Sequence, residues 1–97
     1  MIEVFVLLIV KPRSEDLVYE KLKNAPQVKE IYRVFGEYDI ILHIEVGGIK
    51  ELDDFHDVLR KIEEIRTAET LICSSYKVVV ADENERDLCG KRKLLRI

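Results

Sequence analysis

Apolar residues in this chain fall into segments whose spacing alternates between the patterns of strands and helices. Residues 2–10 are a nearly unbroken apolar run that ends at Lys11, which is typical of a central strand buried on both faces. A helix is predicted next, with Ser14 as its N-cap and Pro26 just beyond its end. The apolar side of this helix consists of Leu17, Val18, Leu22 and Ala25.

The middle of the chain predicts a β-hairpin. Residues 28–35 are rich in β-branched and aromatic side chains and are predicted as a second strand, and residues 40–46 as a third. The sequence Gly-Glu-Tyr-Asp at 36–39 is the turn between them. Alternate positions of the third strand give one fully apolar face and one face that carries Ile41, His43 and Glu45.

Residues 49–62 have the clearest helical periodicity in the chain. The apolar positions in this segment are Ile49, Leu52, Phe55, Leu59 and Ile62. Residues 70–80 have high β-propensity and are predicted as the last strand. We therefore assign residues 1–80 to one domain and residues 81–97 to a charged C-terminal tail, which includes the basic run at 91–93.

The order strand, helix, strand, strand, helix, strand predicts an α+β fold, the ferredoxin-like βαββαβ plait. Right-handed crossovers turn this order into a four-stranded antiparallel sheet with both helices on one face. Phe5, Leu7 and Ile9, or their neighbours, are expected to point to the second face, which nothing in the domain covers. A contiguous apolar face of this size predicts a homodimer in which two sheets pair as a dimeric α/β barrel.

Composition excludes several classes of protein. The net charge of −3 argues against direct, specific DNA binding. The sequence has no run of eighteen apolar residues that would span a membrane. The two cysteines, Cys73 and Cys89, lack the spacing of a disulfide framework or a metal site. We expect a cytoplasmic protein without a metal or cofactor.

Three segments together resemble the effector-binding domain of the Lrp/AsnC family of transcriptional regulators. They are VKEIYRVFGEYDIILHIEV at 28–46, IKELDDFHDVLRKI at 49–62 and AETLI at 68–72. The resemblance covers roughly residues 2–80. Full-length family members have an N-terminal helix-turn-helix domain, whereas this sequence begins at the first strand. It therefore resembles the stand-alone form, called a stand-alone RAM domain.

The resemblance implies a regulatory function without enzymatic activity. It implies paired-sheet dimers assembled into rings, amino-acid effectors bound between protomers, and full-length Lrp/AsnC regulators as further partners, in the regulation of amino-acid metabolism.

The residues of the turn suit such an effector. Backbone N–H groups at Gly36, Glu37 and Tyr38 are expected to bind its carboxylate, and Asp39 its ammonium group. Thr70 is expected to contribute a hydroxyl. Family members often have Thr at the position of Ala68, and Thr or Ser at that of Phe35. Both differences make the site more apolar and favour a hydrophobic amino acid.

Other interpretations remain open at this point. Small dimeric α/β-barrel enzymes, such as monooxygenases and isomerases, have the same order of elements, and a purely structural oligomerisation module is a third possibility. His43 and His56 have no Ser, Cys or second His at a useful spacing, which argues against catalysis. The carboxylate of Asp39 is also suited to bonding the backbone of its own turn.

Overall fold

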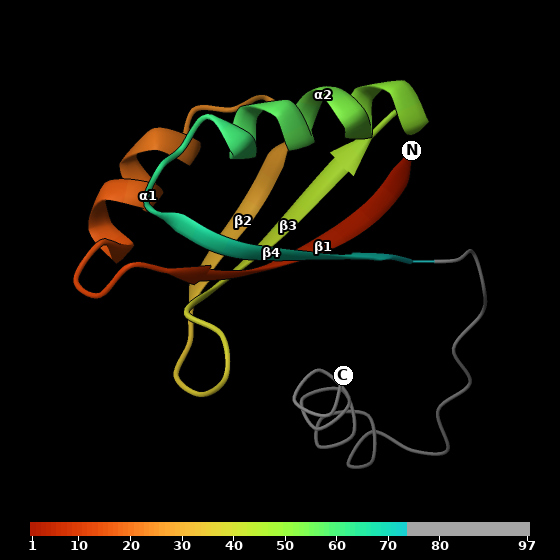
Figure 1. Cartoon of the computed structure of the whole chain (residues 1–97). Helices are drawn as coiled ribbons and strands as arrows, with labels where there is room; N and C mark the ends of the chain where they lie inside the picture. The colour runs from red at the N-terminus through yellow and green to blue at the C-terminus, as the bar shows by residue number, and fades with distance from the viewer. Residues whose placement is uncertain (74–97) are drawn as a thin grey trace, which may run out of the picture.

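The computed structural model describes residues 1–73, and the predicted order of elements is confirmed. The elements are β1 (Ile2–Val10), α1 (Glu15–Leu22), β2 (Val28–Arg33), β3 (Ile40–Val46), α2 (Ile49–Arg60) and β4 (Ile65–Ile72). All neighbouring strands are antiparallel in the order β2-β3-β1-β4. Both helices cover one face of the sheet (Figure 1). The predicted ferredoxin-like fold is therefore confirmed.

The core lies between the helices and the two central strands. Alternate residues of β1 and β3 point toward the helices, and the side chain of Phe55 on α2 is completely buried against them. The other members of this core are Val4, Val6, Leu8, Val10, Val18, Leu22, Ile40, Leu42, Ile44, Val46, Leu52, Leu59 and Ile62. The apolar side chains that recur every 2 residues in the strands and every 3.6 residues in the helices thus pack together in one layer.

Two elements end earlier than their sequence pattern predicts. Helix α1 stops at Leu22 instead of Ala25, because a residue that precedes proline is sterically disfavoured in helical conformation. Strand β2 stops at Arg33 instead of Phe35. Phe35 is 93% exposed in the loop beyond it, so this residue lies outside the strand despite its high β-propensity.

The predicted position of the last strand, residues 70–80, was wrong at its start. Strand β4 begins at Ile65, and its first residue pairs with Val10 of β1. Most side chains of β4 are exposed, so the strand lacks the apolar alternation from which strands are recognised. Residues 74–80 of the predicted strand and the tail 81–97 lie outside the described residues.

The face of the sheet away from the helices is partly apolar and partly polar. Leu7 lies opposite Ile41 on β3 and opposite Glu69 on β4. Toward the other end of this face, His43 bonds Glu3 through Nε2 at 2.9 Å and Glu30 through Nδ1 at 3.0 Å. The contiguous apolar face expected from the sequence is therefore interrupted by polar side chains, and on this face Leu7 of β1 is buried within the single chain.

The two helices of the described part of the chain are short. Neither α1 nor α2 is long and apolar enough to cross a membrane.

Candidate functional site

The loop between β2 and β3 contains four of the five predicted site residues. It extends from the sheet on the side opposite the helices (Figure 1). Asp39 fastens this loop to β1: its backbone N–H donates to the carbonyl of Leu8 at 2.8 Å, and its Oδ2 accepts from the N–H of Val10 at 2.9 Å. The carbonyl of Asp39 accepts from the N–H of Val34 at 3.0 Å, which closes the loop.

The tip of the loop presents backbone donors. Within residues 1–73, the N–H groups of Gly36, Glu37 and Tyr38 donate to no other group. Gly36 has φ +138°, a conformation that is strained for other residues. Nothing lies within 4 Å of the position where a Cβ would stand. Glycine is therefore required by the backbone conformation and not by lack of space.

Tyr38 connects the loop to β4. Its hydroxyl donates to the carboxylate of Glu69. This hydrogen bond raises the pKa of Tyr38 above its usual value of 10.0, because ionising the phenol would remove the donor and place two negative charges together. Glu69 lies opposite Leu7, on the open face of the sheet. The contact therefore holds the loop on that face.

Thr70, the fifth predicted residue, lies on the other side of the sheet. It pairs with Val6, whose side chain is fully buried under the helices. Successive side chains of a strand point to opposite faces, so Thr70 faces the helices while Glu69 faces Tyr38. Within one chain, the structure does not bring Thr70 together with Gly36, Glu37, Tyr38 and Asp39.

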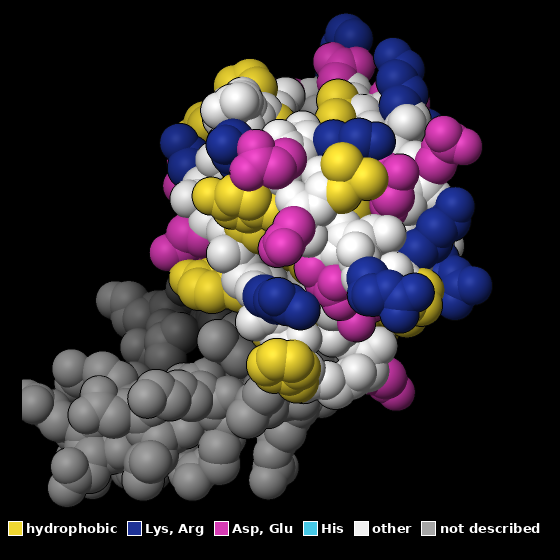
Figure 2. All heavy atoms as spheres, turned by 90° about the vertical axis from the view of Figure 1, so that its left-hand side faces the viewer, with side chains coloured by type: hydrophobic (Ala, Val, Ile, Leu, Met, Phe, Trp, Pro, Cys, Tyr) yellow, Lys and Arg dark blue, Asp and Glu magenta, His cyan; other side chains and the backbone are white. Residues whose placement is uncertain are grey.

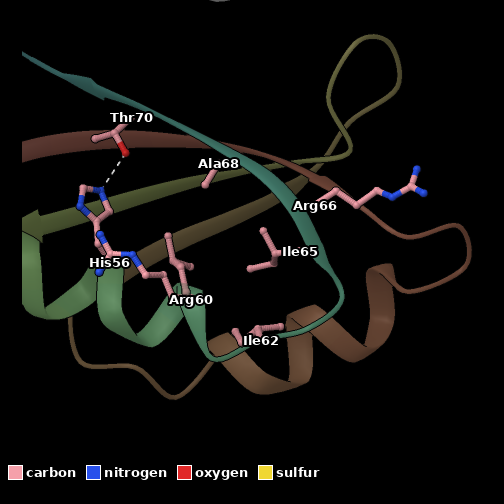
Figure 3. Close-up of a pocket in the computed structure, with 8 residues that line it drawn as sticks. His56, Arg60, Ile62, Ile65, Arg66, Ala68 and Thr70 are labelled. Atoms are coloured by element: carbon pink, nitrogen blue, oxygen red, sulfur yellow. Dashed lines mark hydrogen bonds between the residues drawn. The ribbon is translucent and has the colours of Figure 1, made fainter.

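Thr70 instead lines a cavity of about 390 Å³ between α2 and β4. Its Oγ1 is 2.9 Å from Nε2 of His56, and both groups are partly buried (Figure 3). Arg66 extends away from the cavity in the same view. The residues that line the cavity are His56, Leu59, Arg60, Ile62, Ile65, Arg66, Ala68 and Thr70. A volume in this range fits a small-molecule ligand.

Sequence reasoning gave no binding role to His56 or Arg60. A signal for His56 was present in the helical period: it lies four residues from both Leu52 and Arg60 and next to the buried Phe55. This position is at the border of the apolar face, where a polar tip reaches the edge of the core. The helical period does not show where β4 lies, and the position of β4 determines which residues His56 contacts.

Charges on the face in Figure 2 do not form a basic stripe. Lysine and arginine side chains there are interspersed with aspartate and glutamate. Ion pairs of opposite charge occur in the described part of the chain, and one joins Lys21 of α1 to Glu64, with Nζ and Oε1 2.9 Å apart. A surface of mixed sign provides no continuous track for a phosphate backbone.

A family model, the Lrp/AsnC ligand binding domain, matches residues 3–82. Among curated proteins, the HTH-type transcriptional regulator FL11 of Pyrococcus furiosus is 32% identical over 68 residues. That alignment covers 70% of this chain and 45% of the regulator. The chain thus spans less than half the length of this relative.

Solved structures agree with this match. The crystal structure of FFRP-DM1 is 40% identical, with a TM-score of 0.73, and the match covers 76% of this chain and all of that one. A Thermus thermophilus protein, TTHA0845, is 29% identical, with a TM-score of 0.76, covering 81% of this chain and all of that one.

Proposed function

This chain belongs to the Lrp/AsnC ligand-binding domain family, and from that premise we propose that it binds a free amino acid between two protomers. Binding changes the assembly of the protein and thereby acts in transcriptional regulation of amino-acid metabolism. The curated relative that it matches, FL11, is named as a transcriptional regulator, which favours a regulatory over an enzymatic function.

One observation carries the proposal: the loop has backbone donors that bond no group within residues 1–73, beside an anchored carboxylate. The N–H groups of Gly36, Glu37 and Tyr38 suit the carboxylate of an amino acid, because oriented backbone dipoles attract anions. Asp39 uses part of its acceptor capacity on Val10, and a carboxylate accepts several hydrogen bonds. The acceptor positions of the carboxylate that do not bond Val10 suit an ammonium group. An anion cradle beside an acid is the arrangement that a zwitterion requires.

The division of residues between two faces supports a site made by two protomers. The loop lies on the open side of the sheet, whereas Thr70 and the cavity lie on the helix side. A ligand that uses both sets of groups must contact the loop of one protomer and the cavity of another. Such a contact is heterologous, and repetition of a heterologous contact gives a ring when the rotation between protomers closes. Full-length regulators of the family are candidate partners through the same surfaces.

The test is calorimetry with free amino acids on the wild-type chain and on Asp39→Asn. The asparagine keeps an oxygen for the Val10 N–H and loses the negative charge. An amino acid has few atoms, so we expect wild-type affinity in the micromolar to millimolar range. The Asn variant should lose about tenfold or more for every amino acid that binds. Asp16→Asn, an equal change of charge on the exposed side of α1, should bind as the wild type does.

Two results contradict the proposal. If no amino acid binds the wild-type chain or shifts its oligomeric state, the chain is a structural module. If Asp39→Asn binds at full affinity, the ammonium group is bound elsewhere. The assay must monitor assembly as well as heat, since the proposed signal is a change of assembly.

A further inference from the structure

We propose that the cavity between α2 and β4 selects the side chain of the bound amino acid, and that it prefers a short apolar stem ending in a carboxylate or an amide. This inference rests on the proposed function, because it describes the side-chain part of the same ligand. It assigns His56, Thr70 and Arg60 as the residues that determine specificity.

The lining of the cavity has an apolar part and a polar part. Leu59, Ile62 and Ala68 contribute apolar surface, and the first two are themselves buried. This part alone would favour the hydrophobic amino acid expected from the sequence, and the polar part changes that expectation. None of the eight lining residues is acidic, and the polar ones are His56, Arg60, Thr70 and Arg66, of which Arg66 extends away from the cavity. The ionised groups that line the cavity are therefore all hydrogen-bond donors.

The pair of His56 and Thr70 keeps one donor in either neutral tautomer of the imidazole. When Nε2 carries the proton, it donates to Oγ1 of Thr70, and the hydroxyl hydrogen is left for a ligand. When Nδ1 carries the proton, the hydroxyl donates to Nε2, and the Nδ1–H is left. A partly buried donor that a ligand covers without an acceptor loses its hydrogen bond to water. A leucine or valine side chain would cover this donor and offer it no acceptor.

Arg60 adds donors at the same end. Its guanidinium bonds Asp57 of the same helix, and a guanidinium has five N–H groups, so further donors remain. The side chain of Arg60 is 73% exposed, which weakens any charge effect through solvent screening. We therefore expect acid and amide to bind with similar affinity, and both to bind better than an aliphatic side chain of equal size.

The experiment compares L-glutamine and L-glutamate with L-leucine and L-methionine by calorimetry. The wild type is expected to bind the first two about tenfold more tightly, the ratio expected when one donor loses its acceptor. His56→Leu should remove that preference and leave leucine unchanged or improved. Thr70→Val should weaken glutamine similarly, whereas Thr70→Ser, which keeps the hydroxyl, should restore it. Because Thr70→Val changes little in volume, it tests the pair even if His56→Leu does not fold.

The outcomes separate the two proposals. If leucine binds the wild type more tightly than glutamine and glutamate, this inference is wrong and the proposed function stands. If the preference for glutamine survives both His56→Leu and Thr70→Val, the selecting groups lie outside this cavity, and the inference is again wrong. If no amino acid binds at all, the proposed function has failed and this inference fails with it.

Discussion

The carboxylate of Asp39 accepts a hydrogen bond at 2.9 Å from the backbone N–H of Val10, which lies 29 residues earlier in the chain. The N–H of Asp39 donates to the carbonyl of Leu8 on the same strand. Asp39 thus continues the pairing of β3 with β1 and satisfies a donor at the end of β1. It has a structural task in addition to the ligand role that we propose.

Replacing Asp39 with Ala should therefore destabilise the fold even without a ligand. The N–H of Val10 is left without its partner, and an unsatisfied, partly buried donor costs about 1–3 kcal/mol. Asp39→Asn keeps an acceptor and should lose less than half as much. Urea denaturation of the two variants measures the difference. Equal stability of the Ala variant and the wild type would mean that water replaces the carboxylate at Val10.

The fold was predictable because its two central strands and α2 follow simple periods. Leu42 and Ile44 alternate with His43, and Leu52, Phe55 and Leu59 recur at helical spacing. Strand β4 was harder to place, because it lies at the edge of the sheet and most of its side chains are in water. Its position is set by backbone pairing with β1, which leaves no mark on the pattern of apolar residues.

The candidate site was predictable as a set of residues but not as an arrangement. The turn at 36–39 could be recognised from Gly36 and the strands on either side. The face on which Thr70 points depends on its register with Val6. A shift of one residue would turn every side chain of β4 to the other face. Sequence alone does not fix that register, so the division of the predicted residues between two sides of the sheet could not be foreseen.

The core is expected to depend strongly on Phe55. Its side chain is completely buried, and Phe→Ala substitutions at such positions cost about 3–5 kcal/mol through lost burial and the remaining cavity. Val58→Ala, on the exposed side of the same helix, should change the free energy of unfolding by less than about 0.5 kcal/mol. Denaturant unfolding of both variants checks this. A small effect at Phe55 would mean that the helix packs differently on the sheet.

Stability should decline in acid partly through Glu64. The ammonium of Lys21 donates to its carboxylate and lowers the pKa of Glu64 below its usual value of 4.5. A carboxyl whose pKa is lower in the folded state stabilises above its unfolded pKa, and this contribution is lost as the pH falls through the folded pKa. Glu64→Gln should therefore melt at a slightly lower temperature than the wild type at pH 7.

The pH dependence provides the control for this contact. The difference between Glu64→Gln and the wild type should close as the pH falls well below 4.5. It should also shrink in high salt, because the pair is at the surface. Thermal melts across pH measure both effects. A difference that does not vary with pH would arise from side-chain packing and not from the charge of Glu64.

The open face of the sheet should carry the dimer contact, and Leu7 lies at its centre. It is flanked in register by Ile41 and Glu69, and Phe5 stacks on His43 two positions away. Leu7 is already buried within the single chain, so Leu7→Glu would place a new carboxylate beside Glu69 at a position that pairing of two sheets would cover further. An unpaired buried charge costs several kcal/mol, so sedimentation velocity should show a dimer for the wild type and a monomer for the variant.

Two further variants make the test of this dimer contact specific. Ile49→Glu introduces the same charge at a position on α2 that is 62% exposed, so this variant should remain a dimer. Ile41→Glu repeats the test from the neighbouring strand, and far-UV circular dichroism separates loss of the dimer from loss of the fold. A wild-type chain that sediments as a monomer at micromolar concentration, or a folded Leu7→Glu that stays dimeric, would exclude pairing through this face.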